Sequence, residues 1–184
     1  KYELAKDVFL GIDAAANYFY KNGKYKIRDR SDAFTSDQMI QYYKEIREKY
    51  HVFAVEDGLA EEDWDGWKKL TETLNHSTIL IGDDLLTTNK ERVLRAIQEK
   101  SCTGIIIKPN QIGTISETVE VVKIAKDVGW QTIFSHRSGE TTDDFIADFA
   151  VGLGADYCKF GAPSRGERVI KYNRLSMIYA ELQA

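Results

Sequence analysis

The chain has 184 residues and only two cysteines, which allows one domain with a sizeable buried core and does not indicate a disulfide scaffold. Its 25 basic and 29 acidic residues give a net charge of −4, which argues against a surface that binds nucleic acid. No apolar stretch reaches the ~18 residues that a membrane helix needs and no signal-peptide pattern opens the chain, so we expect a cytoplasmic protein.

Six short apolar runs recur along the chain, and an ionisable residue follows directly after each of them. Those residues are Asp13, Glu56, Asp83, Lys108, His136 and Lys159. Helical patterns fill most of the intervals between them. A strand, a charged residue, a loop and a helix in repetition are typical of a (β/α) barrel, whose chemistry lies at the C-terminal ends of the strands. We therefore predict that the six side chains meet at one mouth.

The long first interval is predicted to contain a β-hairpin over residues 18–27, because Asn22-Gly23 is a two-residue turn signal. Thr35 and Gln38 then predict a capping box at the start of a helix. The apolar face of this helix is expected to contain Met39, Tyr43 and Ile46.

Each later helix is predicted from a residue that can cap its N-terminus: Asp63, Asn89, Thr114 and Thr142. Their apolar faces are expected to pack against the sheet. In chain order these faces comprise Trp64, Trp67, Leu70 and Leu74; Val93, Leu94 and Ile97; Val119, Val122 and Ile124; and Phe145, Ile146 and Phe149. A last helix is predicted over residues 165–182, with Arg165, Arg168, Lys171 and Arg174 on one solvated face.

Three of the strand-end residues are carboxylates: Asp13, Glu56 and Asp83. Carboxylates this close together cannot all stay ionised without a cation among them. Mg²⁺ fits best, because it takes oxygen ligands and keeps positions open for substrate and water. The alternative is that each acid merely caps the turn after its strand, an alternative weakened by three such acids on consecutive strands.

Lys108 follows three isoleucines, so its stem is expected in the apolar barrel and its amine at the mouth. We expect Lys159 and the metal to lower the pKa of Lys108 towards neutrality, as a general base requires. The alternative role for Lys108 is an ion pair with the acidic cluster. The stretch from His136 through Arg137 and Ser138 is expected to cradle a phosphate or a carboxylate. A metal beside a lysine base suits removal of a proton α to a carboxylate.

Five stretches resemble the enolase family over nearly the whole chain: residues 55–59, 82–85, 107–113, 135–140 and 161–165. Asn-Gln-Ile-Gly followed by Ser-His-Arg-Ser-Gly-Glu is the most specific part of the match. The resemblance implies an α/β fold, namely the C-terminal part, about six βα units, of an enolase-type, TIM-like (β/α)8 barrel. It also implies a glycolytic lyase that dehydrates 2-phosphoglycerate to phosphoenolpyruvate with Mg²⁺.

The resemblance implies roles for the matching residues. The implied metal ligands are Asp13, Glu56 and Asp83. The implied catalytic residues are Lys108, which takes the C2 proton, His136 and Lys159. The implied substrate-binding residues are Arg137 and Ser138 for the phosphate, Lys159 for the carboxylate, and Asp84 nearby.

Six βα units are fewer than the eight of a complete barrel. We therefore expect residues 1–184 to be a single partial domain of a longer protein, without the N-terminal domain and first barrel strands, and with an incomplete site. The full-length protein is expected to be a homo-oligomer. Two residues depart from the family pattern. Phe160 replaces the usual threonine and is expected to crowd the phosphate side of the pocket, and Tyr18 stands where a glutamate is expected.

Two other functions stay open. The first is a non-catalytic binding protein, because enolases also serve as plasminogen receptors at the cell surface and as partners in RNA-degrading complexes. Five matched charges at one mouth favour catalysis over this alternative. The second is a related enzyme acting on a sugar acid, against which the Arg137–Ser138 pair argues.

Overall fold

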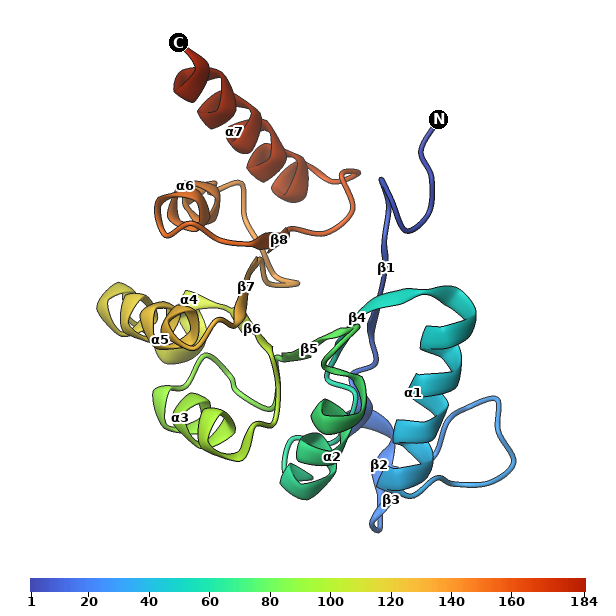
Figure 1. The fold of residues 1–184 in the computed structure, drawn as a ribbon. Helices are drawn as coiled ribbons and strands as arrows, with labels where there is room; N and C mark the ends of the chain where they lie inside the picture. Colours follow the sequence, from blue (N-terminus) through green and yellow to red (C-terminus); the bar gives the residue numbers. More distant parts are fainter.

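The computed structural model describes residues 1–184 and contains one curved sheet of six parallel strands, in the order β1-β4-β5-β6-β7-β8. The strands are β1 Leu10–Asp13, β4 Val52–Glu56, β5 Ile79–Gly82, β6 Gly104–Ile107, β7 Gln131–Ser135 and β8 Tyr157–Lys159. They form an arc with helices along its outer side (Figure 1). This arrangement confirms the predicted partial (β/α) barrel.

The helices follow the strands in the expected alternation. They are α1 Ser36–Tyr50, α2 Trp64–Leu74, α3 Lys90–Glu99, α4 Pro109–Ile112, α5 Ile115–Asp127, α6 Phe145–Gly152 and α7 Gly166–Gln183. None of them combines the length and the apolar character that crossing a membrane requires.

The predicted hairpin is present but shorter than expected. Its strands are β2 Tyr20–Lys21 and β3 Lys24–Tyr25, which pair antiparallel around Asn22-Gly23. Residues 18 and 19 belong instead to a 3-10 helix, η1 Ala16–Phe19, which follows the strand-end Asp13 at a short distance along the chain.

Side chains cap most of the helices as predicted. Thr35 and Gln38 form the full capping box of α1, and Asp63, Asn89 and Thr114 accept backbone N–H groups at the starts of α2, α3 and α5. At α6 the N-cap residue is Asp144, and its side chain makes no capping bond.

The four central strands, β4 to β7, are mostly buried, whereas the outermost strands β1 and β8 are largely exposed. Alternate residues, such as Leu80, Ile105 and Phe134, join the main core between sheet and helices. Their neighbours Ile81, Ile106 and Ile133 form a second apolar cluster on the inner side of the arc. The inner face therefore carries a layer of buried apolar side chains beneath the C-terminal ends of the strands.

Four residues do not lie where the helix patterns predicted. Leu94 is 47% exposed and Phe145 is 46% exposed, because each lies at the margin of its apolar stripe. In α5 Val122 is buried and Ile124 packs against the main core as predicted, but Val119 is only partly buried, and Val121 and Ala125 are fully buried instead. Lys171 of α7 is fully buried, at 0% exposure, and does not belong to a solvated face. It has an anionic partner in Glu140, which belongs to a distant loop.

Candidate active site

The alternation of side chains along each strand brings the predicted charges together. Five charged residues fall in the inward-facing series, above the apolar layer of Ile81, Ile106 and Ile133: Asp13, Glu56, Asp83, Lys108 and Lys159. A cavity of about 330 Å³ opens at this end of the sheet. Its lining includes all the predicted site residues except Glu56, namely Asp13, Asp83, Asp84, Lys108, His136, Arg137, Ser138 and Lys159.

Lys159 joins two of the carboxylates. Its Nζ lies 2.8 Å from Asp13 Oδ2 and 2.7 Å from both carboxylate oxygens of Glu56. Burial opposes the charge on Lys159, but the hydrogen bonds to Asp13 and Glu56 outweigh burial and raise its pKa. Burial also raises the pKa of Glu56 to about 7, although Lys159 acts in the opposite direction. Glu56 therefore titrates near neutrality in the absence of a further cation.

Lys108 projects from the end of β6 towards Asp83, and its Nζ forms a short ion pair with Asp83 Oδ2. The backbone changes direction there because Pro109 occupies the first position of α4, where proline is favoured. The backbone N–H of Lys108 donates to the buried hydroxyl of Thr88 at 3.0 Å. This hydrogen bond holds the lysine where the strand ends. Sequence reasoning missed Thr88, because nothing in its local pattern indicates a distant partner.

The unpaired carboxylate oxygen of Asp83 indicates whether the site suits a metal ion. Asp83 is 8% exposed, and its Oδ1 is buried without any hydrogen-bond partner. A buried carboxylate oxygen of this kind is a strong acceptor that lacks a donor or a cation. With Asp13 and Glu56 at the same mouth, the set offers the oxygen ligands that Mg²⁺ prefers. The residues therefore fit a divalent cation.

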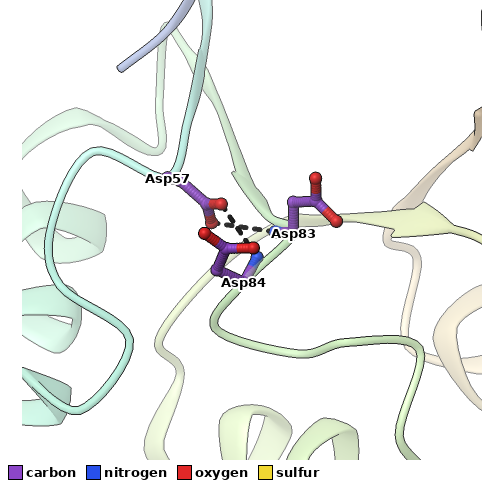
Figure 2. A group of neighbouring side chains, drawn as sticks. All are labelled: Asp57, Asp83 and Asp84. Atoms are coloured by element: carbon purple, nitrogen blue, oxygen red, sulfur yellow. Dashed lines mark hydrogen bonds between the residues drawn. The ribbon is translucent and has the colours of Figure 1, made fainter. Parts of the chain in front are cut away.

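Asp57, which no sequence pattern singled out, supports Asp83 and Asp84 through their backbone N–H groups. Its carboxylate accepts the backbone N–H of Asp83 at 2.9 Å and that of Asp84 at 2.8 Å, and Figure 2 shows the carboxylate directed at both nitrogens. Carboxylate oxygens of the three residues lie within 4.8 Å of one another. Because both oxygens of Asp57 already accept N–H groups, this residue orients the other two rather than offering free ligand atoms.

Burial dominates the titration of Asp57 and Asp84. It raises the pKa of Asp57 to about 7, against the two backbone N–H groups, which lower it. Burial also raises the pKa of Asp84, and the charge of Asp83 adds to that shift. A cation near these carboxylates would favour their ionised forms. In the sequence, the signals for Asp57 were its place directly after the strand-end Glu56 and its position within the family-like stretch 55–59.

The loop between β7 and α6 supplies the cationic side of the cavity. His136 lies one residue beyond the end of β7, and its backbone N–H donates to the Lys159 carbonyl at 3.0 Å. The Arg137 guanidinium donates to Asn110 Oδ1 at 3.0 Å, which places it between this loop and α4. Ser138 follows in the lining. An arginine and a hydroxyl side by side can bind an anion.

The backbone of Gly161 passes close to His136 and leaves no room for a side chain. Gly161 has a φ of +78°, and a Cβ there would lie 2.6 Å from Arg168 Cδ and 2.9 Å from His136 Cε1. Burial lowers the pKa of His136, and the charge of Arg168 lowers it further. The imidazole therefore favours its neutral form.

The two departures from the family pattern have different outcomes. Phe160 is fully buried and packs against Tyr172, with ring centroids 6.0 Å apart, and it does not line the cavity. The expectation that it crowds the pocket was wrong, because successive residues of β8 point to opposite faces and Lys159 takes the inner one. Tyr18, by contrast, lies at the rim of the cavity and is 83% exposed.

Together the fold and the cavity define a βα-barrel domain with a cluster of carboxylates and lysines at the C-terminal ends of its strands. The family model described as "Enolase, C-terminal TIM barrel domain" matches residues 1–184. The chain therefore belongs to the enolase family, which confirms the resemblance seen in its motifs.

Curated relatives agree with this assignment. The chain is 44% identical over 181 residues to Enolase 1 of Methanospirillum hungatei, which covers 98% of this chain and 42% of the relative. It is 48% identical over 181 residues to an enolase of Natranaerobius thermophilus, again covering 98% of this chain and 42% of the relative. The chain thus spans about two fifths of the length of these relatives.

Proposed function

We propose that the protein is an enolase that reversibly dehydrates 2-phosphoglycerate to phosphoenolpyruvate with Mg²⁺. The observation that supports this most is the meeting of three carboxylates and two lysines on the inner face of one sheet, beside a loop with an arginine and a serine. An acidic cluster next to a lysine and an anion-binding loop suits a substrate with both a carboxylate and a phosphate.

Asp13, Glu56 and Asp83 would hold the metal. Asp83 Oδ1 is already free for it, whereas Asp13 and Glu56 share the ammonium of Lys159. When bound, Mg²⁺ supplies positive charge that stabilises the negative charge developing on the substrate carboxylate. The three residues leave other coordination positions for the substrate.

Lys108 takes the proton from C2 of the substrate in this proposal. Its ammonium and a cation both need the carboxylate of Asp83. When Asp83 serves as a metal ligand, Lys108 would lose this anionic partner, and its side chain would be free to turn towards C2 of the substrate. The apolar layer beneath it, which includes Ile106, keeps water away from the lysine stem.

Arg137 and Ser138 bind the phosphate in this proposal, and Lys159 binds the carboxylate. His136 stands next to Lys159 and donates its backbone N–H to the Lys159 carbonyl. Asp84 lies beside Asp83 in the lining of the cavity. We assign no residue of the chain as the acid that helps the hydroxide leave. The cytoplasmic location and the homo-oligomer remain predictions.

The first experiment is the formation of phosphoenolpyruvate from 2-phosphoglycerate, measured with Mg²⁺ and with excess EDTA, in the protein as it occurs with any segments that flank residues 1–184. We expect turnover that EDTA abolishes and added Mg²⁺ restores. Turnover that is insensitive to EDTA would contradict the metal assignment, and no turnover in the intact protein would contradict the proposed reaction.

A matched pair of variants locates the metal. Asp83→Asn is expected to weaken Mg²⁺ binding about tenfold or more, because it removes a charged ligand from the centre of the acidic cluster. Asp127→Asn, at an exposed position of α5, is the control and is expected to bind Mg²⁺ like the parent protein. Isothermal titration measures both. Equal affinities in the two variants would remove Asp83 from the metal site.

A further inference from the structure

The last helix contains a lysine that is buried completely. Lys171 of α7 is 0% exposed, and a buried ammonium is stable only with full pairing. Its Nζ lies 2.8 Å from Glu140 Oε2 and donates to the carbonyls of Glu167 at 2.8 Å and Thr141 at 3.1 Å. These three contacts use all three protons of the ammonium.

The other oxygen of Glu140 reaches the candidate site. Glu140 Oε1 accepts the backbone N–H of Arg137 at 3.0 Å, and the backbone N–H of Glu140 donates to the Arg137 carbonyl at 3.2 Å. The side chain of Arg137 then extends to Asn110. A continuous series of hydrogen bonds therefore runs from the buried ammonium of Lys171 to the residue that lines the cavity.

An ion pair of this kind is a poor source of stability by itself, because removing both charges from water costs about as much as their attraction returns. The packing of α7 does not depend on it alone. Arg174, one turn further along α7, makes two hydrogen bonds to Asp148 of α6 at 2.8 and 2.6 Å. The distinctive consequence of the Lys171–Glu140 pair is the fixed position of the loop.

We propose that Lys171 is a positioning residue, which acts through Glu140 to fix the backbone of Arg137 and thereby the anion-binding side of the cavity. The claim that Arg137 binds the substrate phosphate rests on the proposed function. The claim that Lys171 holds the loop does not, because it depends only on the contacts of Lys171, Glu140 and Arg137.

Three variants test this proposal in the protein as it occurs. Lys171→Met replaces the ammonium by an apolar side chain of similar length. The double variant Lys171→Met/Glu140→Gln leaves no unpaired buried charge and keeps a side-chain oxygen that can accept the Arg137 N–H. We therefore expect it to fold even if the single variant does not. Arg174→Met is the control, because it removes a cation from the same helix without touching the loop.

The readouts are hydrogen–deuterium exchange of residues 135–140 and the kinetic constants for 2-phosphoglycerate. We expect exchange in this segment to become about tenfold faster in both Lys171 variants, since the Glu140 side chain is no longer held. We expect KM to rise about tenfold with kcat changed by less than about threefold, because the loop serves binding. Arg174→Met is expected to change neither.

A folded double variant with parental exchange in residues 135–140 would overturn the proposal. A loosened loop with unchanged KM would also overturn it, because the loop would then not position the binding group. If the parent protein does not turn over 2-phosphoglycerate, the proposed function fails. The exchange of residues 135–140 then decides by itself whether Lys171 positions the loop.

Discussion

Replacing Asp57 tests how the acidic cluster is supported. Its carboxylate is 4% exposed and accepts two backbone N–H groups, from Asp83 and Asp84. Asp57→Ala leaves both N–H donors without a partner, at a cost of about 1–3 kcal/mol each. The lost hydrogen bonds should therefore lower the free energy of unfolding by about 2–6 kcal/mol. Asp57→Asn keeps one acceptor oxygen, so we expect about half of that loss.

The backbone conformation of Asp57 makes a second contribution to the loss of stability in Asp57→Ala. A third variant separates this contribution from the loss of the hydrogen bonds. Its φ is +44°, a left-handed conformation that asparagine and glycine adopt more readily than alanine. Asp57→Gly removes the same hydrogen bonds as Asp57→Ala without the strain of about 1 kcal/mol. The expected order of stability is therefore parent, Asn, Gly and Ala.

Urea unfolding followed by tryptophan fluorescence measures these differences. With a slope of about 2 kcal/mol per molar urea, the midpoint should fall by about 0.5–1.5 M for Asn and, with the backbone strain included, by about 1.5–3.5 M for Ala. Mg²⁺ titration of the Asn variant, which stays folded, should show weaker binding, because Asp83 and Asp84 lose part of their support. A midpoint for Asp57→Ala within about 0.3 M of the parent would refute the reasoning.

The remaining predictions concern the lysine base, a glycine contact and the cysteines. Lys108→Ala should abolish turnover while Mg²⁺ affinity, measured by titration, is retained; a large loss of affinity would mean that the lysine mainly organises the metal ligands. Gly161→Ala should destabilise the protein by about 1 kcal/mol and lower turnover, because the added Cβ clashes with His136 at 2.9 Å. Thermal unfolding and steady-state rates check this, and unchanged values would contradict it. Burial raises the pKa of the Cys102 thiol, so at pH 8 a thiol reagent should modify only the exposed Cys158 in the native state and both cysteines after unfolding.

Much of the site was predictable from the local sequence, because each strand of the barrel is followed in the same way by a functional residue at its C-terminal end. A strand alternates its side chains, and a charge at its C-terminal end falls at the mouth. Asp13, Glu56, Asp83, Lys108 and Lys159 follow this rule, and the structure places them accordingly. The capping residues were predictable for a similar reason, since each acts within one turn of its own helix.

The residues that sequence reasoning missed act through contacts far along the chain. Lys171 was expected on a solvated face, because helical spacing shows which charges share a face but not what covers that face. Its partner Glu140 lies on a loop before another helix. Asp57 and Thr88 likewise act on residues of neighbouring strands. Phe160 was misplaced for a different reason, because family comparison identified a substitution without indicating the face to which it points.

The bond between Lys159 and Asp13 connects the two ends of the strand order, since β1 and β8 are the outermost strands of the sheet. These strands share no backbone ladder, so within residues 1–184 the side-chain ammonium of Lys159 links them. The same ammonium is proposed to bind the carboxylate of the substrate. A ligand that draws Lys159 away from Asp13 therefore weakens this link between β1 and β8. By thermodynamic reciprocity, anything that spreads the two edges apart must change the affinity for that ligand by the same free energy.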